Sequence, residues 1–178
     1  MLQSFPPVRL AALDLDGTLL DSQGRLSPEN LDAIRRMTDK GYCFVPTSGR
    51  NREQIPQALQ QFPGIRYLIT LSGACVTQLP EGKALFRHPL SREHADRLLR
   101  IGKQQGAAVL LYTPEGVLLE HGALEQRQDR ALLEDAIGAC RQVEDAQAFC
   151  LAEDVQVEKA VFFCRDAAQE LSLIHISE

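Results

Sequence analysis

Short apolar runs alternate with amphipathic stretches over the first part of the chain. The runs at 9–14, 42–46 and 67–71 are strand-length, and the first, being continuously apolar, is predicted to be a buried strand. Between them, 28–40 and 55–62 place apolar residues at helical spacing. Strand, helix, strand, helix, strand predicts an α/β fold with a parallel sheet and right-handed crossovers.

Local sequence signals define the ends of the first predicted helix more clearly than those of the second. Ser27 is a good N-cap, Pro28 suits the first helical position, and Gly41 is suited to end the helix. Pro56 lies near the start of the second helix, which leaves its beginning open.

The pattern changes near residue 80, where an α+β region begins. Its expected elements are a strand at 84–88, a helix at 91–105, a hairpin of "AAVLLY" and "VLLE" around "TPEG", a helix at about 126–140 and a strand at 155–163. We therefore expect one domain at 1–79 and a second, α+β domain at 80–170.

Composition and charge narrow the class of protein. The chain has 178 residues, 44% of them hydrophobic, and a formal net charge of −5, which argues against nucleic acid as a partner. Its five cysteines are odd in number and lack a CxxC pair, so free thiols are expected. The N-terminus lacks a secretion signal and no apolar run approaches the ~20 residues of a membrane helix, which favours the cytoplasm and no membrane partner. The oligomeric state stays open.

Two carboxylates follow the first strand in "LAALDLDGTLLDS". Asp14 ends that strand, Asp16 comes two residues later, and Ser48 follows the second strand. Ligands of open parallel sheets bind at the carboxyl ends of the strands, so Asp14 and Ser48 should meet if the two strands are neighbours. A carboxylate there can attack phosphorus and form an aspartyl-phosphate, a second acid can serve as general acid and then base, and Mg²⁺ can offset the charge.

The surrounding residues are those that a phosphate group requires. Gly17 permits a sharp turn. The candidate phosphate ligands are the hydroxyls of Thr18 and Ser48, the N–H of Gly49 and the guanidinium of Arg50. The alternative is that "DLDG" is only a turn after a strand, since Asp and Gly are common turn residues. The longer D-x-D-G-T-L pattern and its strand-then-loop context favour the chemical interpretation.

These motifs resemble those of the haloacid dehalogenase (HAD) superfamily of phosphohydrolases, and in particular its Cof-type members. "LDLDGTLLDS" is similar to the first family motif, "TSGR" to the second, and "LSGACV" to an N-G-A segment, with Ser72 in place of asparagine. The resemblance implies a Rossmann-like parallel-sheet core with an inserted α+β cap domain. It also implies that Asp14 is the nucleophile and a Mg²⁺ ligand, and that Asp16 is the acid/base and a metal ligand through its backbone carbonyl.

Two further family motifs, a lysine and a G-D-x-x-N-D segment, have no clear counterpart. Lys159 fits a strand residue better than the missing lysine. The end of the chain, 171–178, resembles non-native sequence, so we expect a fragment with an incomplete core and an incomplete cap. Its first strand should then have an unpaired apolar edge, and the chain alone should bind Mg²⁺ weakly and have little phosphatase activity.

The expected function is thus that of a Mg²⁺-dependent phosphatase. Its substrate would be a small phosphorylated metabolite such as a sugar phosphate, hydrolysed through an aspartyl-phosphate. Two alternatives stay open: a phosphomutase, which shares the first motif, and a non-catalytic binding or regulatory protein.

Overall fold

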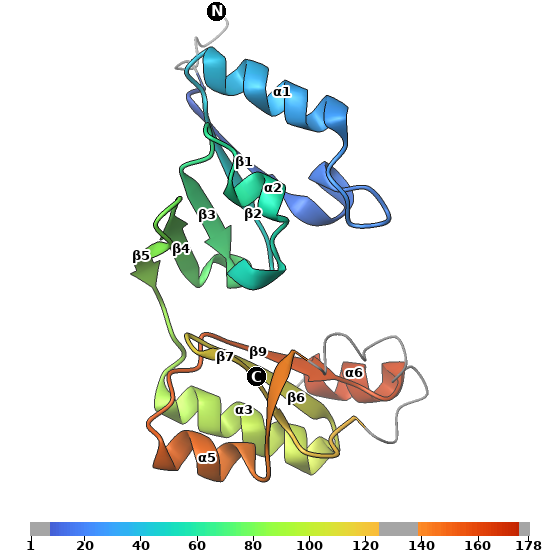
Figure 1. Ribbon diagram of the computed structural model, residues 1–178. Helices are drawn as coiled ribbons and strands as arrows, with labels where there is room; N and C mark the ends of the chain where they lie inside the picture. The colour runs from blue at the N-terminus through green and yellow to red at the C-terminus, as the bar shows by residue number, and fades with distance from the viewer. Residues whose placement is uncertain (1–7, 125–138, 175–178) are drawn as a thin grey trace, which may run out of the picture. The chain divides into compact units, whose positions relative to one another are not determined.

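The computed structural model describes residues 8–124 and 139–174 of the chain. They form two compact units that divide between His88 and Pro89 (Figure 1). The helix expected at 126–140 lies almost wholly outside the described residues. Within the described ranges, no helix is long and apolar enough to cross a membrane.

The first unit is a five-stranded sheet in the order β1-β2-β3-β4-β5. The strands are β1 Leu10–Asp14, β2 Cys43–Thr47, β3 Tyr67–Thr70, β4 Cys75–Gln78 and β5 Lys83–Arg87. The pairs β1–β2 and β2–β3 are parallel, whereas β4 and β5 pair antiparallel. The predicted α/β fold with a parallel sheet is therefore confirmed.

Helix α1, Pro28–Asp39, begins where the sequence predicts. The Ser27 hydroxyl accepts a hydrogen bond from the Asn30 N–H at 3.1 Å, and Pro28 occupies the first helical position. The second helix is shorter than expected because Pro56 interrupts it. A 3₁₀ turn at Arg52–Gln54 comes first, and α2, Gln57–Gln60, begins directly after the proline.

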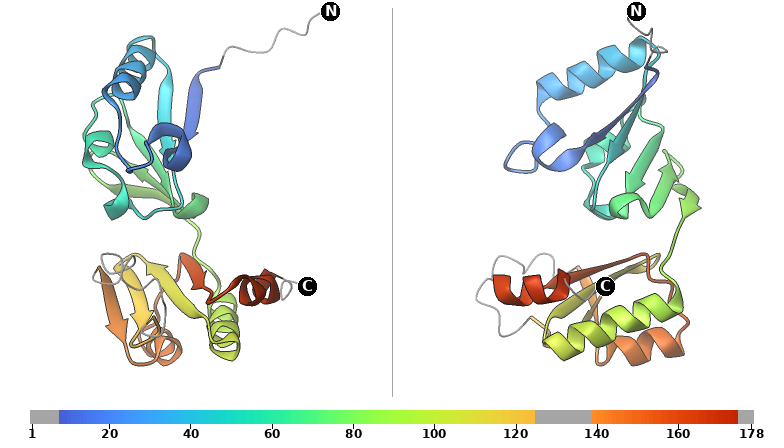
Figure 2. Two further views of the ribbon diagram at one scale, coloured as in Figure 1. Left: turned by 90° about the vertical axis from the view of Figure 1, so that its right-hand side faces the viewer. Right: turned by 180° about the vertical axis from the view of Figure 1, so that it is seen from behind.

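Both helices lie on one face of the first sheet (Figures 1 and 2). Phe44, Leu59 and Leu68 are fully buried in the core between the helices and the sheet. Leu15 and Leu19, which flank the acidic turn after β1, belong to the same core. The core therefore anchors the segment that carries Asp16.

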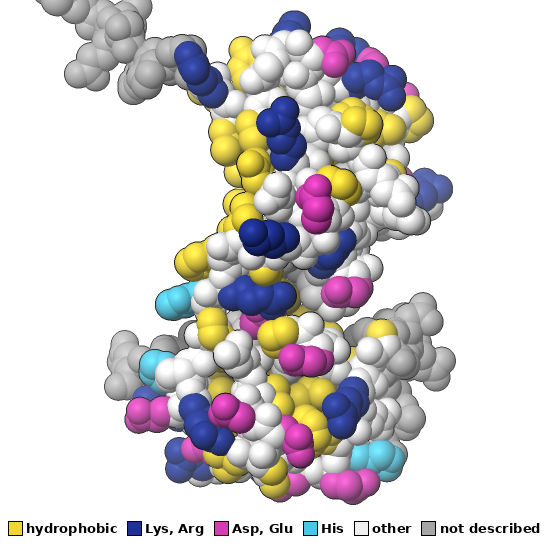
Figure 3. All heavy atoms as spheres, turned by 60° about the vertical axis from the view of Figure 1, so that its left-hand side comes forward, with side chains coloured by type: hydrophobic (Ala, Val, Ile, Leu, Met, Phe, Trp, Pro, Cys, Tyr) yellow, Lys and Arg dark blue, Asp and Glu magenta, His cyan; other side chains and the backbone are white. Residues whose placement is uncertain are grey.

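The prediction that the first strand is buried throughout is wrong. Ala12 and Asp14 are exposed, and 54% of the Leu10 surface is accessible. Within the described residues β1 pairs only with β2, so it lies at the edge of this sheet. Figure 3 shows hydrophobic side chains at the surface of the chain, and Leu10 and Phe86 are among the exposed ones.

The strand predicted at 84–88 belongs to the first unit rather than the second. It is β5, which pairs antiparallel with β4 through partners such as Val76 and Phe86. Strand β4 was not predicted, because its "CVTQ" segment is short and follows β3 closely. The structure thus divides the chain after β5, whereas the sequence pattern placed the division at 79/80.

The second unit is an α+β arrangement with a four-stranded sheet in the order β8-β7-β6-β9. The strands are β6 Ala108–Thr113, β7 Gly116–Glu120, β8 Cys140–Val143 and β9 Lys159–Phe163, and the helices are α3 Arg92–Gln105, α5 Ala146–Ala152 and α6 Ala167–Ile174. The predicted hairpin is confirmed as β6–β7. Helix α5 was not predicted.

Gly102 lets α3 approach β6 closely. A Cβ atom at this position would lie 2.3 Å from the Val109 Cγ2 atom and 3.3 Å from the Phe162 Cε1 atom. We expect Gly102→Val to reduce the free energy of unfolding by about 1–3 kcal/mol, the usual cost of overpacking. Chemical denaturation followed by circular dichroism would measure this. The control is Gln104→Val at an exposed position of the same helix; an equal loss in both variants would contradict the packing explanation.

Candidate active site

The ends of β1 and β2 bring together the two groups that the sequence singled out. Asp14 is the register partner of Thr47, and Ser48 is the next residue of that chain segment. The Ser48 N–H donates to the Ile69 carbonyl at 2.9 Å, which continues the parallel pairing toward β3. The expected proximity of Asp14 and Ser48 at one edge of the sheet is confirmed.

The acidic turn Leu15–Leu19 presents its polar residues to solvent. Leu15 and Leu19 are buried, whereas Asp16, Gly17 and Thr18 are exposed. Gly17 has φ +73°, and a Cβ atom there would meet nothing within 4 Å. The glycine is therefore required by the left-handed backbone rather than by lack of space. The result is an exposed turn held in place by two leucines.

The loop after β2 is fixed by backbone hydrogen bonds from the segment after β3. The Leu71 N–H donates to the Arg50 carbonyl at 2.9 Å, and the Ser72 N–H donates to the Ser48 carbonyl at 3.1 Å. Leu71 and Ser72 have φ +53° and +57°, values that non-glycine residues adopt at a cost. Ser72 replaces the asparagine of the N-G-A segment, and asparagine tolerates this left-handed conformation better than serine does. Position 72 therefore serves to shape the backbone of this turn.

Within the loop, the Ser48 side chain is buried and serves the backbone. Its hydroxyl oxygen accepts a hydrogen bond from the Arg50 N–H at 3.1 Å. This hydrogen bond holds the hydroxyl oxygen within the loop. Gly49 is exposed beside it.

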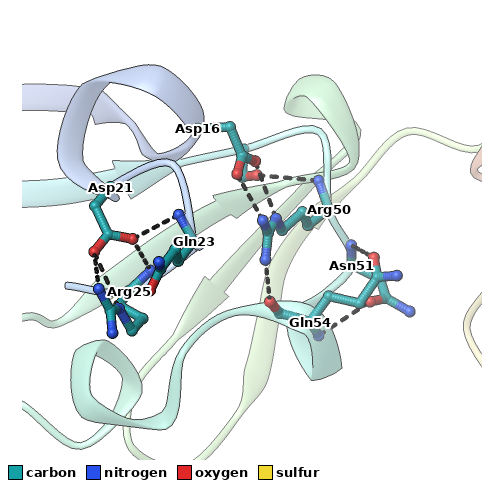
Figure 4. A network of polar contacts seen from close by, with 8 residues as sticks. Asp16, Asp21, Gln23, Arg25, Arg50, Asn51 and Gln54 are labelled. Carbon is teal, nitrogen blue, oxygen red and sulfur yellow. Dashed lines mark hydrogen bonds and ion pairs between the residues drawn. The ribbon is translucent and has the colours of Figure 1, made fainter. Parts of the chain in front are cut away.

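Arg50 contacts Asp16 directly (Figure 4). Its Nε donates to Oδ2 of Asp16 at 3.0 Å, and its Nη2 donates to Oδ1 at 2.6 Å. Its Nη1 donates to the Gln54 carbonyl at 3.1 Å. The sequence placed Arg50 near a phosphate group, and it did not foresee the pair with Asp16.

Asn51 and Gln54 are supporting residues that the sequence reasoning missed. Their side chains cap the 3₁₀ turn reciprocally: the Asn51 side chain accepts from the Gln54 N–H, and the Gln54 side chain accepts from the Asn51 N–H, both at 3.2 Å. The signal was present as N-x-x-Q, a variant of the capping box. This turn sets the position of the Gln54 carbonyl that holds Arg50.

Asp21 orders the turn that follows the acidic segment. Its Oδ1 accepts hydrogen bonds from the N–H groups of Gln23 and Arg25 at 2.8 and 2.9 Å, and Arg25 also pairs with its Oδ2 (Figure 4). The backbone N–H of Arg25 is the main reason that the pKa of Asp21 lies below its usual value. Asp21 is thus a turn residue.

Lys159 lies in the second unit, on β9. Its Nζ is 5.6 Å from the centre of the Tyr112 ring, and burial lowers its pKa. These contacts agree with the expectation of a strand residue. The five cysteines are free thiols, as predicted, and no group of three or more His, Cys, Asp or Glu residues forms a metal cluster in 8–124 or 139–174.

Curated relatives of the chain include HMP-PP phosphatases. The protein from Klebsiella pneumoniae is 33% identical over 91 residues, which cover 51% of this chain and 33% of the relative. The protein from Cronobacter sakazakii is 29% identical over 113 residues, which cover 64% of this chain and 41% of the relative. The matched region thus spans about a third to two fifths of the length of these relatives.

Solved structures share the fold over nearly the whole chain. A haloacid dehalogenase-like hydrolase from Bacillus subtilis has a TM-score of 0.76 at 20% sequence identity. The superposition covers 96% of this chain and 67% of the Bacillus subtilis chain. A sugar phosphatase of HAD subclass IIB has a TM-score of 0.74 at 15% sequence identity. That superposition covers 94% of this chain and 63% of the sugar phosphatase chain. At these identities the likeness establishes the fold alone.

The family profile of haloacid dehalogenase-like hydrolases matches residues 11–173. The match spans β1, the acidic turn and most of the second unit. The resemblance to Cof-type HAD hydrolases that the motifs predicted is confirmed. The chain belongs to the haloacid dehalogenase-like hydrolase family.

Proposed function

We propose that this chain carries part of the active site of a Mg²⁺-dependent phosphatase that works through an aspartyl-phosphate. The observation that supports this most directly is the register of β1 and β2, because it sets Asp14 beside the Ser48 loop at the carboxyl edge of the sheet. Asp16 and Arg50 are paired at the same edge. The proposed nucleophile, proton carrier and phosphate donors therefore all come from the segments that follow two neighbouring strands.

In the first half-reaction, a carboxylate oxygen of Asp14 attacks the phosphorus atom of the substrate. The bond between phosphorus and the leaving-group oxygen breaks, and Asp16 donates a proton to that oxygen. The exposure of both side chains gives a substrate access to them. The Ser48 hydroxyl and the Gly49 N–H are the proposed donors to the phosphoryl oxygens.

In the second half-reaction, water attacks the phosphorus of the aspartyl-phosphate. Asp16, now ionised, accepts a proton from that water, and the bond between phosphorus and the Asp14 oxygen breaks. Inorganic phosphate leaves, and Asp14 regains its carboxylate. Both halves require the Asp16 carboxyl to face the same point in space.

The donor set at the turn fits Mg²⁺. Asp14 offers an exposed carboxylate, and hard oxygen ligands of this kind are the ones that Mg²⁺ prefers. The main-chain carbonyl of Asp16 is the second proposed ligand, as the resemblance of the first motif to the family implies. When bound, the ion would neutralise charge on the phosphoryl oxygens.

A small phosphorylated metabolite is the proposed substrate. The named relatives act on HMP-PP, and a structural neighbour is a sugar phosphatase, so both substrate types are the first to test. A cytoplasmic site of action is part of the same proposal. The matched region covers only 33% of the Klebsiella pneumoniae phosphatase. Phosphatase activity is therefore a proposal for this chain.

The test is Mg²⁺-dependent release of phosphate from p-nitrophenyl phosphate, HMP-PP and a sugar phosphate by the purified chain. We expect low turnover, because the two proposed protein ligands include only one anionic group to hold the ion. EDTA should remove this turnover, and Mg²⁺ in excess should restore it. Turnover that persists unchanged in EDTA would contradict the metal-dependent mechanism, and robust turnover would contradict the expectation of a weak enzyme.

A further inference from the structure

The guanidinium of Arg50 uses its donors in two directions. Two of its nitrogens meet the two carboxylate oxygens of Asp16, at 2.6 and 3.0 Å, and the third meets the Gln54 carbonyl at 3.1 Å (Figure 4). A forked pair of this kind fixes the plane of the carboxylate as well as its distance. The Asp16 carboxyl is therefore oriented by a group that is itself held on its far side.

The backbone of Arg50 is equally constrained. Its N–H donates to the Ser48 hydroxyl at 3.1 Å, and its carbonyl accepts from the Leu71 N–H at 2.9 Å. The capped turn that contains Gln54 begins two residues after Arg50. The arginine is thus fixed at its backbone and at the tip of its side chain.

The free energy of the pair is not its main contribution. The side chains of Asp16 and Arg50 are 54% and 33% exposed, and ion pairs at such exposed positions contribute little to stability. Orientation is the larger effect, because the acidic turn that carries Asp16 is otherwise open to solvent. An acid/base group that rotates freely spends little time facing the reacting oxygen.

We infer that Arg50 is a positioning residue for Asp16: it orients the ionised carboxylate that accepts a proton from the attacking water, with the Asn51–Gln54 turn as its support. This inference rests on the proposed function of Asp16. It differs from the role of phosphate ligand that the sequence predicted for Arg50. The two roles have different kinetic consequences, because a phosphate ligand contributes to binding and a positioning residue contributes to turnover.

The first experiment detects the pair without any turnover. The chain is labelled with carboxyl-¹³C aspartate, and Asp16→Asn identifies the Asp16 signal. We expect this signal to move with added NaCl, because salt screens an exposed pair. In Arg50→Gln the signal should shift and lose that salt dependence. The matched control is Arg25→Gln, which breaks the similar pair with Asp21 and should leave the Asp16 signal in place.

The second experiment separates turnover from binding. Arg50→Gln should lower kcat by about 10²-fold, the usual cost of a misplaced group, with KM and inhibition by inorganic phosphate nearly unchanged. Arg50→Lys keeps the charge without the fork and should recover little of kcat. Asn51→Ala should give a smaller loss. Melting temperatures of these variants should stay close to that of the wild type.

The outcomes distinguish the alternatives. An Asp16 signal that is the same in wild type and Arg50→Gln would overturn the inference, as would a raised KM with kcat unchanged, which identifies a phosphate ligand. Failure of the proposed function is seen separately, as wild-type turnover that Asp14→Asn and Asp16→Asn leave intact. If the wild type shows no turnover, the carboxyl signal and its salt dependence decide whether Arg50 holds Asp16.

Discussion

Replacement of Asp14 by asparagine is expected to remove any Mg²⁺-dependent phosphatase activity of the chain. Asparagine keeps the size of the side chain but lacks the anionic oxygen that attacks phosphorus. It also weakens the proposed metal site, because a carboxylate is replaced by a neutral amide. Phosphate release from p-nitrophenyl phosphate, measured with and without Mg²⁺, should fall to the rate without protein.

The control for this variant is Asp21→Asn. Asp21 is a carboxylate of the neighbouring turn, and its hydrogen bonds are to Gln23 and Arg25 rather than to the site. Its replacement should leave most of the activity in place. Turnover that survives in Asp14→Asn at the wild-type level would show that another group is the nucleophile.

The second large effect is on stability. Phe44 is fully buried in the core of the first unit, and Phe44→Ala should reduce the free energy of unfolding of that unit by about 3–5 kcal/mol. The loss combines the burial of the ring with the cavity that it leaves. Since small domains have about 5–15 kcal/mol in total, much of the first unit should unfold in mild denaturant.

Leu111→Ala is the matched variant in the second unit. Leu111 is also fully buried, but it belongs to a different hydrophobic cluster. We expect a loss of about 2–5 kcal/mol that is confined to the second unit. Amide hydrogen exchange would report on the two units separately. Loss of protection in both units from either single variant would contradict two separately packed cores.

The sequence predicted the parallel part of the sheet and the proximity of Asp14 and Ser48 at the carboxyl ends of its strands. The runs that became β1 and β2 are short and apolar, and their neighbouring positions follow from the topology of α/β folds. The cap at Ser27 and the turn at Gly17 were also predicted, because each depends on one local conformation. Asp14 and Ser48 therefore lie close together at the carboxyl ends of β1 and β2, as the sequence predicted.

Other features depend on contacts that no local pattern encodes. The exposure of β1 follows from the strand order, which places it beside β2 alone within the described residues. The pair of Asp16 with Arg50 joins two loops that the sheet brings together. A sequence motif gives the residue types of such a site, whereas the partner of each charged group becomes visible only in three dimensions.

The central claim is that Asp14 receives the phosphoryl group, and covalent trapping tests it most directly. The chain and its Asp16→Asn variant are incubated with Mg²⁺ and an acyl phosphate, denatured in acid, digested and examined by mass spectrometry. We predict one added phosphoryl group on the peptide that contains Asp14, in greater amount in Asp16→Asn because hydrolysis of the intermediate lacks its general base. A phosphoryl group on another residue, or its persistence at this peptide in Asp14→Asn, would contradict the claim.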